Sequence, residues 1–382
     1  MRSIAFGRGR GPVRSICSVP VGLRRDAGHR AILVVRPHRQ RTRRLTTSTS
    51  ISIRLTLSTT GMLMPTILIT GGHGGIGFEC VKQLTAQGFD IVLAGRDPSR
   101  LEQAASALRP SSGVQVTVLT MDVSSLRSVR EAAAQCRQMI DSRQMSRLQA
   151  ILCNAGATFR GAPTYTNDGY ELTFATNYLG HFLLVQLLLD GLEDDGRVVF
   201  TASGTHDPDT TDGKFIGRAM KPGAIALAKD GLEGNEPLPG GKRYTTSKLC
   251  VVLHAYELGR RLKAASIGIS SIAYDPGAIA ATGLLRDVPG PARALIGSRP
   301  VRWLMKRVGL TLGDLVLSGR ALADLAVSGD VVSGRYYQWK DGALRERRSA
   351  AMSYDRELAE ALWRDSRTLV QLRSEEEPER LK

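Results

Sequence analysis

Short apolar runs alternate with helical periods along the chain from Met64 onward. In the helical periods, apolar residues recur three and four positions apart, which places them on one face of a helix. Proline disfavours helical conformation in the residue before it, so Arg109-Pro110 is expected to end the second helix. The apolar runs predict strands at 66–69, 90–94, 114–121, 148–153, 196–201, 269–274 and near 331–339. The helical periods predict helices at 75–87, 99–108, 126–140, 169–189, 244–264 and near 315–327.

This alternation predicts an α/β fold, a doubly wound parallel sheet of the Rossmann type with helices on both faces. We expect one domain over 64–370, with its ligands beyond the carboxyl ends of the strands. Two insertions interrupt the pattern, one over 204–243, rich in Gly, Pro and Asp, and one over 278–314, apolar and basic. Long insertions at this edge are typical of substrate loops. Residues 371–382 are expected to form a charged tail.

The N-terminal segment, residues 1–63, has a different composition. It contains 13 Arg, no Lys and one acid, Asp26, so it carries +12 of the net charge of +16. The remaining +4 predicts no nucleic-acid partner. We expect a basic, disordered extension, either a transit peptide or an over-called start ahead of Met62 or Met64, with a functional basic arm as a third alternative. The expected location is cytoplasmic, or mitochondrial or another organelle if the segment is a transit peptide.

No apolar stretch reaches 18 residues, so no transmembrane helix is expected. The five cysteines form no CxxC pair and show no metal-ligand spacing, which favours a reducing compartment. No metal site is predicted.

A glycine-rich loop follows the first predicted strand of the domain and opens a helix. Its residues are Thr70, Gly71, Gly72, His73, Gly74, Gly75, Ile76 and Gly77. Glycines let the backbone approach a pyrophosphate closely, and the helix N-terminus offers free N–H groups to the phosphates. The loop therefore predicts a dinucleotide site, the alternative being a flexible turn.

The end of the second predicted strand indicates which dinucleotide. Ala94 and Gly95 stand where an acid would bind the ribose 2′-hydroxyl of NAD, and Arg96 follows. An Arg there can pair with a 2′-phosphate. We expect NADP(H), with NAD(H) kept open because Asp97 is adjacent; a surface Arg without a ligand is the other alternative.

Tyr244 and Lys248 are predicted to share a helix face, since residues four apart lie side by side. An ammonium beside a phenol favours the phenolate, so we expect the Tyr244 pKa to lie below its usual value and Tyr244 to exchange a proton with a carbonyl or alcohol. Ser203 follows the fifth strand and is either a site residue or a turn cap. Asn177 is a mid-helix Asn, either functional or a satisfied core residue, and His181 is expected in the core.

The order of these motifs resembles the short-chain dehydrogenase/reductase family, closely over 64–278 and more loosely to about 370. Asp122-Val123 resembles the family's adenine contact, Asn154-Ala155-Gly156 its sheet-steadying element, and Pro276-Gly277 the border of the nicotinamide. The resemblance implies that Ser203 holds the substrate oxygen and that Lys248 reaches the cofactor ribose. It also implies that Asn177 holds a proton-relaying water. The implied reaction is hydride transfer between a nicotinamide and a carbonyl or alcohol.

The long gap between Ser203 and Tyr244 resembles the branch with retinol dehydrogenases and protochlorophyllide reductases. So do 177–184, 353–355 and 362–363. The branch implies a bulky, hydrophobic small-molecule substrate, without selecting one. The alternative function is a non-catalytic NADP-binding regulator or scaffold. Residues 283–312 are expected to wall an apolar pocket, with peripheral membrane contact as the alternative. Both a monomer and a homodimer remain open.

Overall fold

The computed structural model describes residues 64–159, 161–232, 234, 236–279, 298, 301, 303, 307–340 and 342–382, and the backbone of two strands nearer the N-terminus. The chain divides into two compact units, 1–60 and 61–382. In the first, predicted to be a disordered extension, β1 (Val21–Arg25) and β2 (Ala31–Val35) pair antiparallel.

The second unit is built on an eight-stranded sheet with the order β10-β9-β8-β7-β6-β3-β4-β5. All neighbouring strands are parallel except β9 and β10, so the sheet is doubly wound as the alternation predicted. The strands are β3 (Thr66–Thr70), β4 (Asp90–Gly95), β5 (Val116–Thr120), β6 (Leu148–Cys153), β7 (Leu192–Thr201), β8 (Ser270–Asp275), β9 (Arg335–Lys340) and β10 (Ala343–Arg347).

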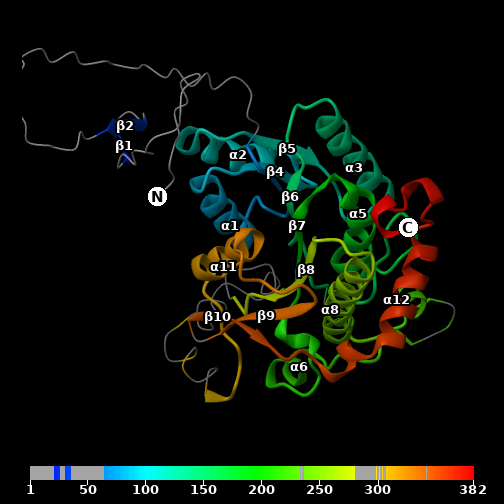
Figure 1. The fold of residues 1–382 in the computed structure, drawn as a ribbon. Helices are drawn as coiled ribbons and strands as arrows, with labels where there is room; N and C mark the ends of the chain where they lie inside the picture. Colours follow the sequence, from blue (N-terminus) through cyan, green and yellow to red (C-terminus); the bar gives the residue numbers. More distant parts are fainter. Residues whose placement is uncertain are drawn as a thin grey trace, which may run out of the picture. The chain divides into compact units, whose positions relative to one another are not determined.

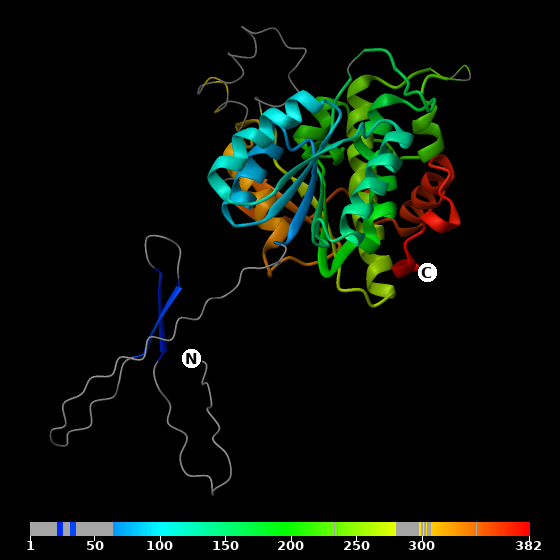
Figure 2. The same cartoon turned by 90° about the horizontal axis from the view of Figure 1, so that it is seen from above.

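Helices cover both faces of this sheet (Figures 1 and 2). Side chains alternate between the faces of a strand, so β3 contributes Ile67 and Ile69 to one core and Leu68 to the other. One face packs against α1 (Gly75–Ala86), α2 (Pro98–Ser112) and α11 (Leu315–Val327). The other packs against α3 (Leu126–Asp141), α4 (Leu172–Phe174), α5 (Gly180–Leu188), α8 (Gly240–Ala264) and α12 (Arg356–Leu369).

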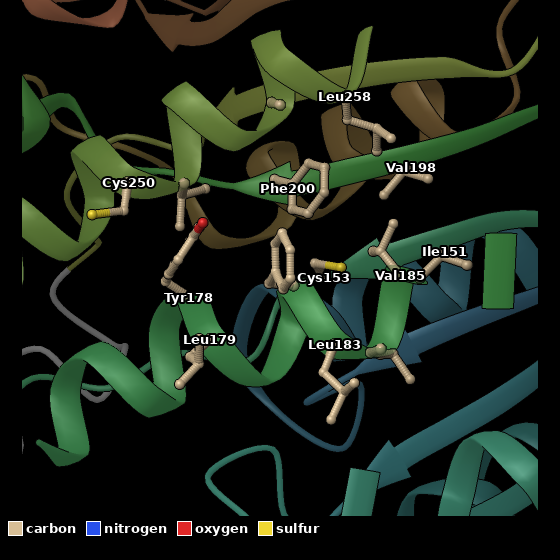
Figure 3. Packing of buried hydrophobic residues seen from close by; sticks show 14 of the residues in the cluster. Ile151, Cys153, Tyr178, Leu179, Leu183, Val185, Val198, Phe200, Cys250 and Leu258 are labelled. Atoms are coloured by element: carbon tan, nitrogen blue, oxygen red, sulfur yellow. The ribbon is translucent and has the colours of Figure 1, made fainter. Parts of the chain in front are cut away.

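The most apolar helix, Leu172–Gly191, lies in the second core. By length and composition it could cross a membrane, but 89% of its apolar window is buried inside the domain. Tyr178 points from this helix toward helix α8, whereas Leu179 and Leu183 point to the opposite side of the helix, and all three belong to the same core (Figure 3). It is therefore the central core helix of an α/β domain.

Several predicted ends and segments differ from the structure. Helix α2 runs through Pro110 and ends at Gly113, whose φ is +65°. One missing amide in its last turn is outweighed by the burial of Leu101, Ala105 and Leu108. The helix predicted over 169–189 begins at Leu172 and contains a π-helical turn, Ala175–Leu179. Strand β10 and helix α12 were missed.

The insertion over 204–243 is ordered rather than a plain loop. It holds α6 (Thr211–Ile216), α7 (Ala224–Ala228) and the first turn of α8, which starts four residues before Tyr244. A Cβ at Gly241 would lie 1.9 Å from the Ile216 carbonyl oxygen. Only glycine therefore fits where α6 meets α8, although glycine is a poor helix former. Most of the basic and apolar insertion over 278–314 lies outside the described residues, and so do most of its Arg and Lys residues.

The predicted charged tail packs against the domain. Glu376 is buried and its carboxylate accepts hydrogen bonds from Arg130 at 2.7 and 3.0 Å. Leu372 and Leu381 pack against the core beside α12. The four cysteines among the described residues are buried and unpaired.

Candidate active site

A cavity of about 1030 Å³ lies at the carboxyl edge of the sheet. The predicted site residues line it, except Gly72 and Asn177. Thr176, the neighbour of Asn177, is on the wall. The loops after β3, β4, β5, β6, β7 and β8 thus converge on one site, as expected for strands that all point the same way.

The glycine loop has the geometry of a phosphate cradle. Gly71 and Gly75 have φ of +69° and +56°, which side-chain-bearing residues rarely adopt. A Cβ at Gly77 would lie 2.6 Å from the Gly71 carbonyl oxygen, so the first turn of α1 folds tightly against the loop. At Gly74 and Gly75 a Cβ would meet nothing within 4 Å, so the backbone at the start of α1 is open to the cavity. These residues fit a dinucleotide pyrophosphate.

Two arginines border the cavity after β4. Arg96 and Arg100 both line it, and Asp97 lies between them. The Asp97 carboxylate caps α2 by accepting the Arg100 amide at 3.1 Å, and it lies 3.8 Å from the Arg100 guanidinium. Asp97 is therefore engaged with its own helix. Sequence reasoning missed Arg100, although a second Arg in the first turn after Arg96 is a readable signal.

Thr70 and Asn154 join the glycine loop to the end of β6. The Thr70 hydroxyl oxygen accepts the backbone amides of Asn154 and Ala155 at 3.0 and 2.9 Å, and the Asn154 side chain donates to the Thr70 carbonyl at 3.0 Å. His181 lies behind them in the core with Nε2 2.9 Å from the Thr70 hydroxyl. Burial lowers the pKa of His181 to about 4, so it is a neutral structural residue.

Tyr244 and Ser203 both line the cavity. Tyr244 is buried in the first turns of α8, and Ser203 follows β7 in extended conformation. His206 fixes this loop by donating from Nδ1 to the Ser203 carbonyl at 2.7 Å, and its Nε2 accepts the Ala350 amide at 3.1 Å. Both hydroxyls therefore border one cavity, in which a carbonyl oxygen could accept a hydrogen bond from each of them.

The pKa of Tyr244 departs from the sequence expectation. Burial raises it to about 12, a hydrogen bond with Ser203 lowers it, and the negative charge of Asp275 raises it. Lys248 does not reverse this, since its Nζ lies 6.0 Å from the ring centre and donates to the Thr201 carbonyl at 2.8 Å. The predicted lowering was therefore wrong for this structure, because the cost of desolvating a phenolate was not visible in the motif.

Lys248, which lines the cavity, and Asn177, which does not, lie close together beside Gly156. A Cβ at Gly156 would lie 3.3 Å from Lys248 Nζ and 3.2 Å from Asn177 Oδ1. Asn177 accepts the Ala157 amide at 2.8 Å and donates to its carbonyl at 2.9 Å. It sits in the π-helical turn, a feature common at functional sites. Burial lowers the pKa of Lys248 to about 8, against the opposing charge of Asp275.

The rest of the lining includes Asp122, Val123, Pro276 and Gly277. A set of apolar lining residues, called the outer wall below, consists of Ala157, Phe159, Phe215, Ile216, Ile279, Leu310 and Leu312. The cavity that Tyr244 and Ser203 line therefore also offers apolar surface to a ligand.

Sequence reasoning also missed Asp275, which is buried at the end of β8. It accepts from Tyr336 at 3.0 Å, Gln338 at 2.7 Å and the Gly277 amide at 2.9 Å. The sequence gave no reason to expect a buried acid at Asp275, because its side-chain partners Tyr336 and Gln338 lie on β9, far along the chain.

The fold and this site define a dinucleotide-binding oxidoreductase, and comparisons with known proteins agree. Residues 65–210 match the family model described as short chain dehydrogenase. The chain is 33% identical over 326 residues to protochlorophyllide reductase A, chloroplastic, of Oryza sativa subsp. japonica, covering 80% of each chain. It is 32% identical over 314 residues to retinol dehydrogenase 13 of Mus musculus, covering 80% of this chain and 84% of the relative.

Solved structures share the fold. An uncharacterized protein from Mycobacterium paratuberculosis superposes with a TM-score of 0.59 at 25% identity, over 81% of this chain and 95% of that one. L-Sorbose reductase of Gluconobacter frateurii, solved with NADPH and L-sorbose, gives 0.51 at 17% identity, over 73% and 96%. The chain belongs to the short-chain dehydrogenase/reductase family. It is an NAD(P)-dependent oxidoreductase.

Proposed function

We propose that this enzyme transfers a hydride between NADP(H) and a carbonyl or alcohol of a hydrophobic small molecule, with Tyr244 as proton donor and acceptor. The observation that carries the proposal is that Tyr244 and Ser203 line one cavity together with a set of apolar side chains. Pro276-Gly277 and the glycine loop line the same cavity.

Each side chain has a task that follows from its surroundings. Ser203 and Tyr244 donate hydrogen bonds to the substrate oxygen, which stabilises the negative charge that develops there. Tyr244 gives up its proton in reduction and takes it back in oxidation. Lys248 provides a positive charge that favours the phenolate while the proton is away. The nicotinamide supplies the hydride chemistry when bound.

The preference for NADP(H) is supported by Arg96 and Arg100. Both face the cavity after β4, where the ribose of a dinucleotide lies in this fold. A guanidinium pairs with phosphate through two parallel hydrogen bonds. Asp97 does not compete, because its carboxylate caps α2. NAD(H) remains the alternative cofactor.

An apolar substrate is supported by the outer wall of the cavity. Phe215 stands at this wall with 73% of its surface exposed, beside Ile216 and Leu310. Relatives named for protochlorophyllide and retinol support a bulky substrate of this kind.

The name of the rice relative, which is chloroplastic, supports the organelle alternative for the location over the cytoplasm. The N-terminal sequence of the mature protein distinguishes the two.

Fluorescence titration of the full chain with NADPH and NADH tests the cofactor, followed by a screen of aldehydes, ketones and quinones for NADPH oxidation. Tyr244→Phe is then expected to lower kcat by about 100-fold or more, with the NADPH Kd within about twofold. Tyr256→Phe, which also removes a buried hydroxyl from α8, is the matched control and should keep its activity. Full activity in Tyr244→Phe would refute the assignment, and binding of neither cofactor would favour a scaffold role.

A further inference from the structure

His73 occupies an unusual place in the glycine loop between β3 and α1. Its side chain lines the cavity together with Arg96 and Arg100. Its Nδ1 is buried and has no hydrogen-bond partner among the described residues. The imidazole packs against Gly95, where a Cβ would lie 3.4 Å from Nδ1. Because no hydrogen bond of Nδ1 fixes the ring, the imidazole can turn a nitrogen toward a ligand in the cavity.

The charges that act on His73 come from the segment after β4. Burial lowers its pKa first, the positive charges of Arg100 and Arg96 lower it further, and Asp97 opposes them. In the free protein the imidazole is therefore neutral at neutral pH. Two fixed cations and one neutral, titratable base thus surround one corner of the cavity.

We propose that His73 is a third ligand of the cofactor's ribose 2′-phosphate and makes the preference for NADPH over NADH depend on pH. The inference rests on the proposed use of NADP(H). Arg96 and Arg100 supply fixed charge at every pH, whereas His73 adds a charge-assisted hydrogen bond only when it holds a proton.

The direction of the pH dependence follows from linkage. A phosphate placed beside His73 raises its pKa, so binding takes up a proton. The extra affinity is fully present at low pH and is lost as the pH rises through the pKa of His73 in the complex. NADH has no 2′-phosphate and lacks this contribution. The phosphate has its own pKa of about 6 and acts in the opposite direction, since its dianion binds cations better. A variant without an imidazole is therefore needed to separate the two.

The test uses the full chain, His73→Asn and Arg96→Gln. Calorimetry measures Kd for 2′,5′-ADP and for 5′-AMP between about pH 5.5 and pH 8.5. In the wild type, the preference for 2′,5′-ADP should exceed that of His73→Asn by about tenfold at the acid end and by less than about twofold at the alkaline end. Titrations in two buffers of different ionisation enthalpy should show greater proton uptake by the wild type.

Each outcome decides between the two proposals. Equal preferences and equal proton uptake in wild type and His73→Asn would overturn the role of His73. No preference for 2′,5′-ADP at any pH would instead remove the proposed NADP(H) specificity. Arg96→Gln should lose its preference for 2′,5′-ADP across the whole pH range. Urea unfolding midpoints equal to that of the wild type show that both variants are folded.

Discussion

Lys248 shows how a buried charge is held against the fold's own stability. Its side chain is buried on α8, its Nζ donates to the Thr201 carbonyl, and burial lowers its pKa from 10.5 to about 8. A lowered Lys pKa means that the folded state disfavours the ammonium relative to the unfolded chain. At neutral pH the disadvantage is on the order of 3 kcal/mol.

Lys248→Met is therefore expected to be inactive and yet more stable. Below pH 8 its free energy of unfolding should exceed that of the wild type by about 1–2 kcal/mol, after the loss of the hydrogen bond to Thr201. The difference should shrink between pH 8 and 10.5, where the folded wild type releases its proton before the unfolded chain does. Urea unfolding across this range measures it.

Lys263→Met, an exposed change on the same helix, is the control and should show no such pH dependence. A Lys248→Met protein less stable than the wild type at every pH would contradict the argument.

At the residue scale, the sequence predicted which residues line the site better than it predicted their burial and pKa. Most of the predicted site residues line one cavity because they follow strand ends, and strand ends share an edge, whereas Tyr244 and Lys248 reach it from helix α8. The raised pKa of Tyr244 and the buried Asp275 could not be predicted, since both depend on how deeply neighbouring segments cover them.

Two helices that carry site residues are joined by buried charges. Arg243, directly before Tyr244, lies 3.3 Å from the Glu171 carboxylate and 3.7 Å from that of Asp230. Glu171 caps the helix that contains Asn177. Arg243 also donates to the carbonyls of Phe159 and Gly161, the loop on the outer wall of the cavity.

Arg243→Met should leave two carboxylates buried without a cation. The expected loss is about 3–5 kcal/mol in the free energy of unfolding, with a higher KM for the carbonyl substrate because the 157–161 loop loses its anchor. Denaturant unfolding and steady-state kinetics measure both.

Arg335→Met breaks a half-exposed pair with Glu346 and should cost less than about 1 kcal/mol. A similar small effect at Arg243 would show that the buried cluster is dispensable.

Element ends were the least predictable feature of the fold. Hydrophobic periodicity identified most of the strands and helices around the sheet, because burial of one face imposes it. It missed the π-helical turn at Asn177 and the start of α8 at Gly240, which depend on contacts with distant segments. Strand β10 was not predicted, because its mostly exposed residues show little alternation between apolar and polar positions.

On the scale of the whole molecule, the C-terminal segment closes the second face of the domain. The sequence of 371–382, with four Glu, two Arg and one Lys, predicted a charged tail. The partner that holds it, Arg130 on α3, lies more than 240 residues earlier and could not be inferred from local pattern. Burial raises the pKa of Glu376, but hydrogen bonds from Arg130 and Arg373 outweigh it and lower the pKa to about 2.

Removal of 371–382 should therefore destabilise the domain in a pH-dependent way. A carboxyl group whose pKa falls from 4.5 to about 2 on folding stabilises the protein above pH 4.5, and this stabilisation is lost as the pH falls toward 2. At neutral pH we expect a loss of about 2–3 kcal/mol in the free energy of unfolding, and Glu376→Gln in the full chain should reproduce most of the pH-dependent part. Urea unfolding at neutral pH and at about pH 3 compares wild type, truncation and Glu376→Gln. If Glu376→Gln keeps the full acid dependence of the wild type, the pairing with Arg130 is not what fastens the segment, and the apolar contacts of Leu372 and Leu381 would have to hold it alone.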